Sequence, residues 1–175
     1  WYTLSLHDAL PILMLVLLAG ICAVLETRSF RGEHLFQKAQ GAQYWAEQLE
    51  KDGNTRGRDR ALADAYALLE EGRAYLAWDY RFSEKQGQID LICRRFETAS
   101  ARFEDALHCN PHHPGVMSSL AQCYINQAIE SFVKPDGARI SASGPFYDLL
   151  KQAQSRAEQA LSLCPFLPSA HEALG

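Results

Sequence analysis

The sequence lacks several features that mark particular classes of protein. Its five cysteines are odd in number and include no C-x-x-C pair, so they indicate no complete disulfide framework, and we expect free thiols buried in helices. Acidic and basic residues are interspersed, with a formal net charge of -4 and no long run of either sign. That distribution argues against nucleic acid as a partner. No stretch alternates between apolar and polar residues for long enough to form a strand.

Motifs of the common catalytic centres are also missing. The sequence contains no G-x-S-x-G, no phosphate-binding glycine loop and no H-E-x-x-H. Carboxylates are adjacent or scattered along helix faces, where they stay in water, whereas general acid-base catalysis needs two held across a cleft. We therefore expect this chain to be non-catalytic, with no small-molecule substrate. The carboxylates concerned are Glu70 with Glu71, Asp79 with Glu84, and Glu104 with Asp105.

One turn carries imidazole and thiol groups that can bind zinc. A closed structural zinc site needs four ligands in tetrahedral geometry, and no second cluster lies nearby in the sequence. A polar turn beside Pro111 explains these residues better, and we expect neither a metal nor a cofactor. The residues are His108, Cys109, His112 and His113.

What the chain does contain is helical periodicity. With 175 residues, 47% of them hydrophobic, it is long enough for one domain with a substantial core. Apolar residues recur at spacings of three and four between polar or glycine-rich breaks, which predicts an all-α fold. Gly72, inside a predicted helix, is expected to be a packing contact. Helices are expected over residues 35–50, 61–83, 92–108, 115–132, 145–164 and from 168, with breaks at 51–60, 84–88 and 134–144.

The N-terminal region is strongly apolar. Residues 3–12 resemble a translated sequencing-library adapter and are set aside as non-native. Residues 13–25 are uncharged, and counted back to Ala9 the uncharged run has 17 residues, the lower edge of a bilayer span. We predict a transmembrane helix, with a cleaved signal peptide and a buried soluble helix as alternatives. Arg28 and Arg31 follow it, but the positive-inside rule compares two flanks, so the topology stays open.

A helical unit occurs twice. Residues 99–111 and 153–165 each carry small or aromatic residues at helical spacing and a proline five residues beyond the last of them. A new helix is predicted after each proline. Helix hairpins that cannot bury their apolar faces alone must stack on their neighbours. The repeated positions are Ala99, Phe103, Ala106 and Pro111 in the first copy, and Ala153, Ala157, Ala160 and Pro165 in the second.

This pattern resembles the tetratricopeptide repeat (TPR), whose unit is a pair of helices. The two copies match the second helix of two units, and the resemblance covers residues 61–175. The prolines lie 54 residues apart, against a usual unit of about 34, so we expect either insertions at residues 82–88 and 133–144 or helices longer than usual. First-helix positions are matched by Gly72 and Tyr75 in the unit ending at Pro111, by Leu120 and Tyr124 in the next, and by Leu174 and Gly175 in a third.

The resemblance implies a binding surface. In this family the groove is lined by first helices, and it takes a peptide or protein partner. The candidate groove residues lie one turn away from the packing positions, and no basic carboxylate clamp is visible among them. These candidates are Arg73, Ser118, Gln122 and Asn126.

The sequence thus predicts four regions. They are adapter-derived residues 1–12, a membrane segment at 13–27, an amphipathic helix with a polar turn at 28–60, and stacked repeats at 61–175, truncated at the C-terminus. We expect a membrane-tethered scaffold for protein-protein interaction, in the bacterial inner membrane. Two alternatives stay open: the C-terminal repeat tail of a polytopic membrane enzyme of the bacterial O-antigen ligase or polymerase type, and an exported periplasmic repeat protein.

Overall fold

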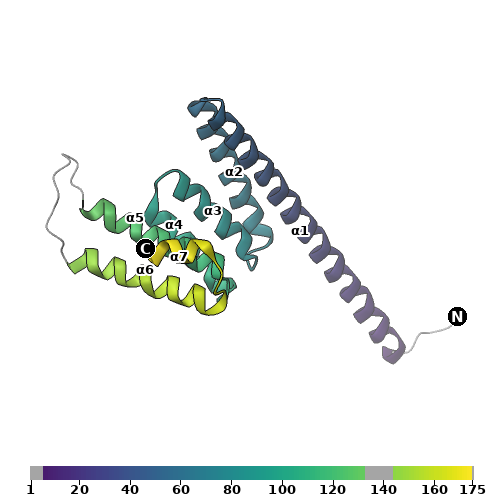
Figure 1. The fold of residues 1–175 in the computed structure, drawn as a ribbon. Coiled ribbons are helices and arrows are strands. Elements are labelled where there is room, and N and C mark those ends of the chain that lie inside the picture. Colours follow the sequence, from purple (N-terminus) through teal and green to yellow (C-terminus); the bar gives the residue numbers. More distant parts are fainter. Residues whose placement is uncertain (1–5, 133–143, 175) are drawn as a thin grey trace.

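The chain folds into helices that stack as antiparallel hairpins, as the sequence predicts (Figure 1). The computed structural model describes residues 6–132 and 144–174, and no strand occurs within those ranges. Helix α1 packs with α2, α3 with α4, and α5 with α6, and α7 lies against α5 and α6. The helices are α1 (Leu6–Lys51), α2 (Thr55–Tyr75), α3 (Tyr80–Ile92), α4 (Phe96–Cys109), α5 (Pro114–Phe132), α6 (Gly144–Leu163) and α7 (Pro168–Leu174).

Two apolar clusters hold the hairpins together. One joins α1, α2 and α3, with Phe36, Leu69 and Phe82 at its centre. The other runs from α4 to α7 and contains the repeated positions predicted from the sequence. Pro111 and Pro165 lie exposed in the turns that follow α4 and α6. Buried in the second cluster are Ala99, Phe103, Ala106, Leu120, Tyr124, Ala153, Ala157 and Ala160.

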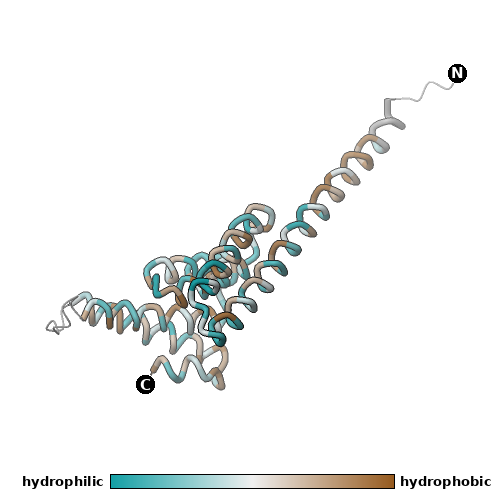
Figure 2. The backbone as a smooth tube through the Cα atoms, turned by 90° about the horizontal axis from the view of Figure 1, so that it is seen from above, coloured by the Kyte–Doolittle hydropathy of each residue, from teal (hydrophilic) through white to brown (hydrophobic). Residues whose placement is uncertain are grey.

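Helix α1 is one continuous helix through both the predicted membrane segment and the predicted amphipathic helix. Its C-terminal half packs on α2, whereas its N-terminal half projects beyond the other helices (Figures 1 and 2). The apolar side chains of the projecting half are exposed, with 56–68% of the surface of Leu13, Leu15 and Leu18 accessible. Nothing in the described chain covers this stretch.

The first two breaks differ from expectation. Residues 51–60 were expected to be non-helical, but α2 already begins at Thr55, because the Asn54 side chain accepts a hydrogen bond from Gly57 N at 2.9 Å and caps the helix. The predicted helix over residues 61–83 is wrong, because α2 ends at Tyr75 and α3 begins at Tyr80. Asp79 caps α3 by accepting from Arg81 N at 3.0 Å. This turn contains neither glycine nor proline, so it lacks the usual sequence signals for the end of a helix.

The next two boundaries are also corrected. Residues 84–88 lie inside α3, where a Cβ on Gly87 would stand 2.9 Å from the Phe103 ring, so this glycine permits close packing. The predicted helix over residues 92–108 instead begins at Phe96, because Arg94 turns the chain with a φ of 59°. The helices predicted at 115–132, at 145–164 and from 168 are confirmed by α5, α6 and α7.

The pairing of helices changes the repeat register. From Tyr80 to Pro114, where α3 and α5 begin, the chain advances 34 residues, which is one TPR unit without an insertion at 82–88. Gly72 and Tyr75 therefore belong to the second helix of the preceding hairpin, and not to the unit ending at Pro111. The second expected insertion, at residues 133–144, and the predicted loop there lie outside the described residues except for Gly144, as does Gly175.

Candidate partner-binding face

The first helices of the three hairpins lie next to one another in the order α1, α3, α5. Arg81 at the start of α3 bridges to α1, where its Nη2 donates to Glu33 Oε2 at 2.8 Å and its guanidinium covers the Phe36 ring at 4.8 Å. Helices α3 and α5 are also in contact, and Leu91 and Ile125 both pack on the second cluster. Three first helices thus share one side of the stack.

Helix α3 presents a polar stripe on that side. Phe82, Gly87 and Ile89 are buried on one side of the helix. Residues spaced three or four apart on another side, beginning with Arg81, are at least partly exposed. Within the stripe, Lys85 Nζ donates to Gln88 Oε1 at 2.9 Å. These residues are not among the predicted groove positions, because the sequence predicts a break at residues 84–88. The stripe consists of Arg81, Glu84, Lys85 and Gln88, and the exposed, apolar Ile92 lies at its end.

Helix α5 carries three of the predicted groove residues, of which two are accessible. Gln122 and Asn126 lie one turn apart and are half-buried. Gln127, by contrast, is held by α4, because its Nε2 donates to Phe96 O and to Ser100 Oγ, both at 2.9 Å. The amide groups of Gln122 and Asn126 are therefore available to a partner, whereas the amide nitrogen of Gln127 is already bonded within the chain. We call Lys85, Gln88, Gln122 and Asn126 the inner face.

A hollow of about 100 Å³ lies between α1, α2 and α3 at one end of this side. Its walls combine the buried Ala46 and Leu62 with charged groups. Arg58 Nη1 lies 3.1 Å from Glu50 Oε1, so this positive charge is already paired. The lining residues are Gln43, Ala46, Glu47, Glu50, Arg58, Leu62, Lys85, Gln88 and Ile92. The mixed charge does not favour an anionic ligand over a neutral one.

Glu33 of α1 lies beside the N-terminal end of α3. A hydrogen bond from Gln37 at 3.2 Å and one from Arg81 lower the pKa of the Glu33 carboxyl below its ordinary value. Arg81 also pairs with Asp79 at 2.6 Å. This charge network ties α1 to the start of α3, where Arg81 is already paired with two carboxylates.

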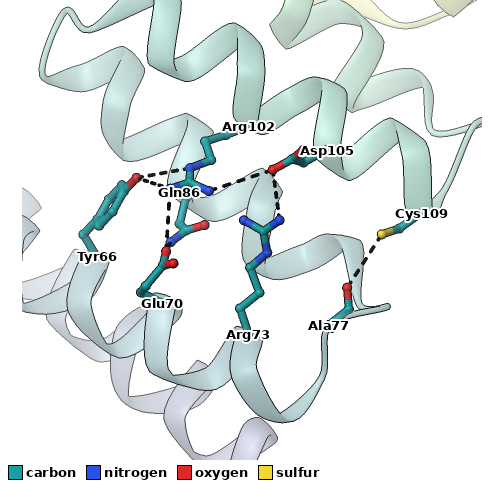
Figure 3. Close-up of polar contacts among 8 residues, drawn as sticks. All are labelled: Tyr66, Glu70, Arg73, Ala77, Gln86, Arg102, Asp105 and Cys109. Atoms are coloured by element: carbon teal, nitrogen blue, oxygen red, sulfur yellow. Dashed lines mark hydrogen bonds and ion pairs between the residues drawn. The ribbon is translucent and has the colours of Figure 1, made fainter.

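The structure places Arg73 away from the inner face. Arg73 lies on α2, and its Nη2 donates to Asp105 Oδ2 of α4 at 3.0 Å. Figure 3 shows the network around this pair, in which Tyr66 and Glu70 of α2 face Gln86 of α3 and Arg102 of α4. Arg73 thus lies on a second helix, on the side that faces another second helix, and not on one of the three first helices. Ser118 is 2% exposed on α5, so its side chain is not accessible to a partner either.

One buried carboxyl was not found from the sequence. Asp90 is fully buried on α3, and neither carboxylate oxygen has a hydrogen-bond partner among the described residues. Arg95 Nη2 lies 2.5 Å from Oδ1 without the alignment of a hydrogen bond. Burial raises the pKa of Asp90, and the positive charges of Arg95 and Arg102 oppose that shift. Asp90 follows Gly87 by three residues, as Tyr124 follows Ala121, so its position is one that an aromatic residue fills in the next unit.

No metal centre is formed among the residues that the structure describes, where no group of three potential ligands comes together. The His113 ring packs against Tyr80, with ring centroids 4.9 Å apart, and its Nδ1 accepts from Val116 N at 3.1 Å. This contact helps to begin α5. The turn thus has a structural role at this histidine.

No family model and no curated protein matches the chain. Among solved structures, the chain is similar to the first TPR of Spaghetti (RPAP3), which was determined bound to the HSP90 peptide SRMEEVD. The TM-score is 0.54 at 14% sequence identity, over 79% of this chain and 88% of that chain. The fold is a TPR-like helical repeat. At such low identity the likeness concerns the fold alone.

Proposed function

We propose that this chain is a membrane-anchored, non-catalytic TPR-like scaffold that binds a protein or peptide on its inner face. The observation that carries the proposal is the exposed apolar half of α1, which continues without a break into the first hairpin of the repeat body. One helix therefore joins a candidate membrane span to a candidate binding module.

Membrane insertion explains why the projecting half of α1 is apolar on all sides. A helix of this composition in a soluble protein is normally buried, yet no residue of its most apolar window is buried here. At about 1.5 Å per residue, the 13 uncharged residues 13–25 extend about 20 Å. Residues 9–12, which were set aside as adapter-derived, bring the uncharged run to about 26 Å, close to the thickness of a bilayer core. We propose that lipid covers this stretch and that the membrane is the bacterial inner membrane.

Cysteine accessibility tests insertion directly. The expectation that the cysteines are buried is wrong for Cys22, Cys93 and Cys109, which are exposed. Cys22 lies in the apolar half of α1, and Cys93 follows α3. In variants that keep one of these cysteines, reconstituted in phospholipid nanodiscs, we expect a water-soluble maleimide to label Cys93 at least tenfold faster than Cys22. Unfolding in detergent and denaturant should make the two rates similar. Equal labelling in nanodiscs would show that α1 is not inserted.

Partner binding is supported by the chemistry of the inner face. The similar RPAP3 domain holds a peptide, and the amide groups of Gln122 and Asn126 can each donate and accept hydrogen bonds. Such groups suit the backbone of an extended peptide, which offers both donors and acceptors. The Gln88 amide, in contrast, bonds to Lys85 and Glu84 within α3. Lys85 is accompanied by Glu47 and Glu50 in the same hollow, so we propose a partner segment that is not strongly acidic.

A random peptide library tests this face. Peptides selected on the purified chain should bind the Gln122→Ala/Asn126→Ala variant at least tenfold more weakly than the unchanged chain. The matched control is Gln154→Ala/Glu158→Ala, which alters an exposed pair on α6, whose side chains hydrogen-bond each other at 2.8 Å. If selection yields no binders, or if the two variants bind alike, the inner face is not the binding site.

A further inference from the structure

The turn between α2 and α3 lies beside α1 immediately after the apolar stretch. Arg28 Nη2 donates to Ala74 O at 3.3 Å, and the Arg31 guanidinium covers the Tyr75 ring at 5.5 Å. A Cβ on Gly32 would stand 2.6 Å from Leu76 Cδ1, so α1 and the turn are in close contact. The turn is therefore at the level of residues 28–32 of α1.

Two large aromatic side chains are exposed at this level. Trp78 in the turn is 68% exposed, and Phe30 on α1 is 77% exposed. Phe30 lies two residues before Gly32, which faces the turn, so Phe30 points to another side of α1. Exposed aromatics thus occur at one level on more than one side of the helix. A pocket for a protein ligand would instead gather them on a single side.

We propose that the α2–α3 turn and residues 28–32 of α1 lie in the headgroup layer of a phospholipid bilayer. This inference rests on the proposed insertion of α1. Tryptophan favours the membrane-water interface because its ring is apolar and its N–H can donate a hydrogen bond. The exposed guanidinium groups of Arg28 and Arg31 are suited to bind lipid phosphates. Three acidic residues lie nearby. Glu33 and Asp79 are paired with Arg81, whereas Glu26 is not part of that network.

Helix geometry supports this depth. From Leu25, the last residue of the apolar run, to Phe30 is five residues, or about 8 Å along the helix. The headgroup region on each side of a bilayer is about 5–8 Å thick. Arg28 and Phe30 therefore fall within this layer, and Arg31 and Gly32 lie at its outer edge, when the apolar run that ends at Leu25 lies in the core. Trp45, also exposed on α1, lies about 22 Å beyond Phe30 and outside this layer.

The position of the turn is fixed relative to the bilayer. No linker separates the apolar stretch from the repeats, because α1 is continuous and residues such as Phe36 and Ala39 are buried in the first hairpin. The repeat body would consequently stand on the membrane in a defined orientation. A flexible tether would instead let it move away from the surface.

Depth-dependent quenching of tryptophan fluorescence tests the inference in the full chain. The chain contains Trp1, Trp45 and Trp78, and variants with the other two changed to phenylalanine keep Trp78 or Trp45 alone. A third variant has all three changed and carries Leu17→Trp in the apolar stretch. Each is reconstituted in phosphatidylcholine-phosphatidylglycerol vesicles that contain nitroxide lipids, labelled either at the headgroup or near the end of the acyl chain. Helicity measured by circular dichroism confirms folding.

We expect the headgroup nitroxide to quench Trp78 at least threefold more than Trp45, and the chain-end nitroxide to quench the Leu17→Trp variant most strongly. If the Leu17→Trp variant is quenched in this way and Trp78 behaves like Trp45, the headgroup contact is wrong while the membrane anchor stands. If the Leu17→Trp variant is not quenched, insertion itself fails and the headgroup contact fails with it.

Discussion

Gly72 and Phe82 are packed so closely that no side chain fits between them. A Cβ built on Gly72 of α2 would lie 2.3 Å from Cε1 of the fully buried Phe82 ring at the start of α3. The same ring contacts Phe36 of α1, with centroids 5.2 Å apart. One glycine therefore allows three helices to meet around a single aromatic side chain.

Gly72→Ala should destabilise the fold. Alanine favours a helix over glycine by about 1 kcal/mol, but overpacking against a buried ring costs about 1–3 kcal/mol, so we expect a net loss of about 1 kcal/mol. The control is Gly41→Ala in α1, where nothing lies within 4 Å of the new Cβ, and which should gain up to about 1 kcal/mol. Urea unfolding followed by circular dichroism measures both, and equal effects of the two substitutions would contradict the packing role.

Asp90 should make stability depend on pH. Burial raises the pKa of Asp90 in the folded chain above its value in the unfolded chain, near 3.8. The stability linked to this carboxyl is therefore fully present below the unfolded pKa and is lost as the pH rises through the folded pKa. Asp90→Asn removes the buried charge, and we expect it to stabilise the fold by about 1 kcal/mol at pH 7 and less at pH 4. Urea midpoints at the two pH values check this. An equal shift at both would rule out titration of Asp90 as the cause.

Arg73 should contribute to stability and not to partner binding. Its ion pair with Asp105 is partly exposed, with 30% and 46% of the two side chains accessible, so a double-mutant cycle should give a coupling of about 0.5 kcal/mol that weakens in high salt. Peptides that bind the inner face should bind Arg73→Ala as they bind the unchanged chain. A loss of binding as large as that of the Gln122→Ala/Asn126→Ala variant would show that Arg73 takes part in partner binding.

Cys123 should be unreactive in the folded chain. It is fully buried on α5, and burial, followed by the negative charge of Asp90, raises the pKa of its thiol to about 12. At pH 8 an aromatic disulfide reagent should modify the exposed Cys93 and Cys109 within minutes, and Cys123 at the rate of unfolding. Mass spectrometry of peptides follows each site. Rapid modification of Cys123 would show that the α4–α5 core opens readily.

The repeated positions were predictable because their pattern is local. Ala99, Phe103 and Ala106 lie on one face of a single helix, and Pro111 ends it, so spacing alone indicates that they are packed. The same reasoning predicted that Gly72 is a contact, although its partner, Phe82, could not be named. Gln122 and Asn126 were placed on the accessible side of α5 by the same periodicity.

The boundaries between α2, α3 and α4 were not predictable from the same signals. Asp79 is a capping residue without a neighbouring glycine or proline, and Arg94 adopts a left-handed backbone that few non-glycine residues take. The sequence predicts that the helix is broken around Gly87, but Gly87 lies inside α3, where the absence of a side chain makes room for the Phe103 ring. The sequence therefore predicts Gly72 and Arg73 in the first helix of a unit, whereas both lie in α2, the second helix of the preceding hairpin.

By itself the sequence determined the all-helical composition, the faces of α4, α5 and α6 that are buried, and the apolar character of α1, because each depends on residues within a few turns of one another. The tertiary structure decided which helices pair, that Arg73 bonds to α4, and that α1 is one helix with Trp78 beside the end of its apolar half. Those relationships depend on contacts between residues far apart in the chain, such as Arg28 with Ala74 and Glu33 with Arg81, which helical periodicity does not encode.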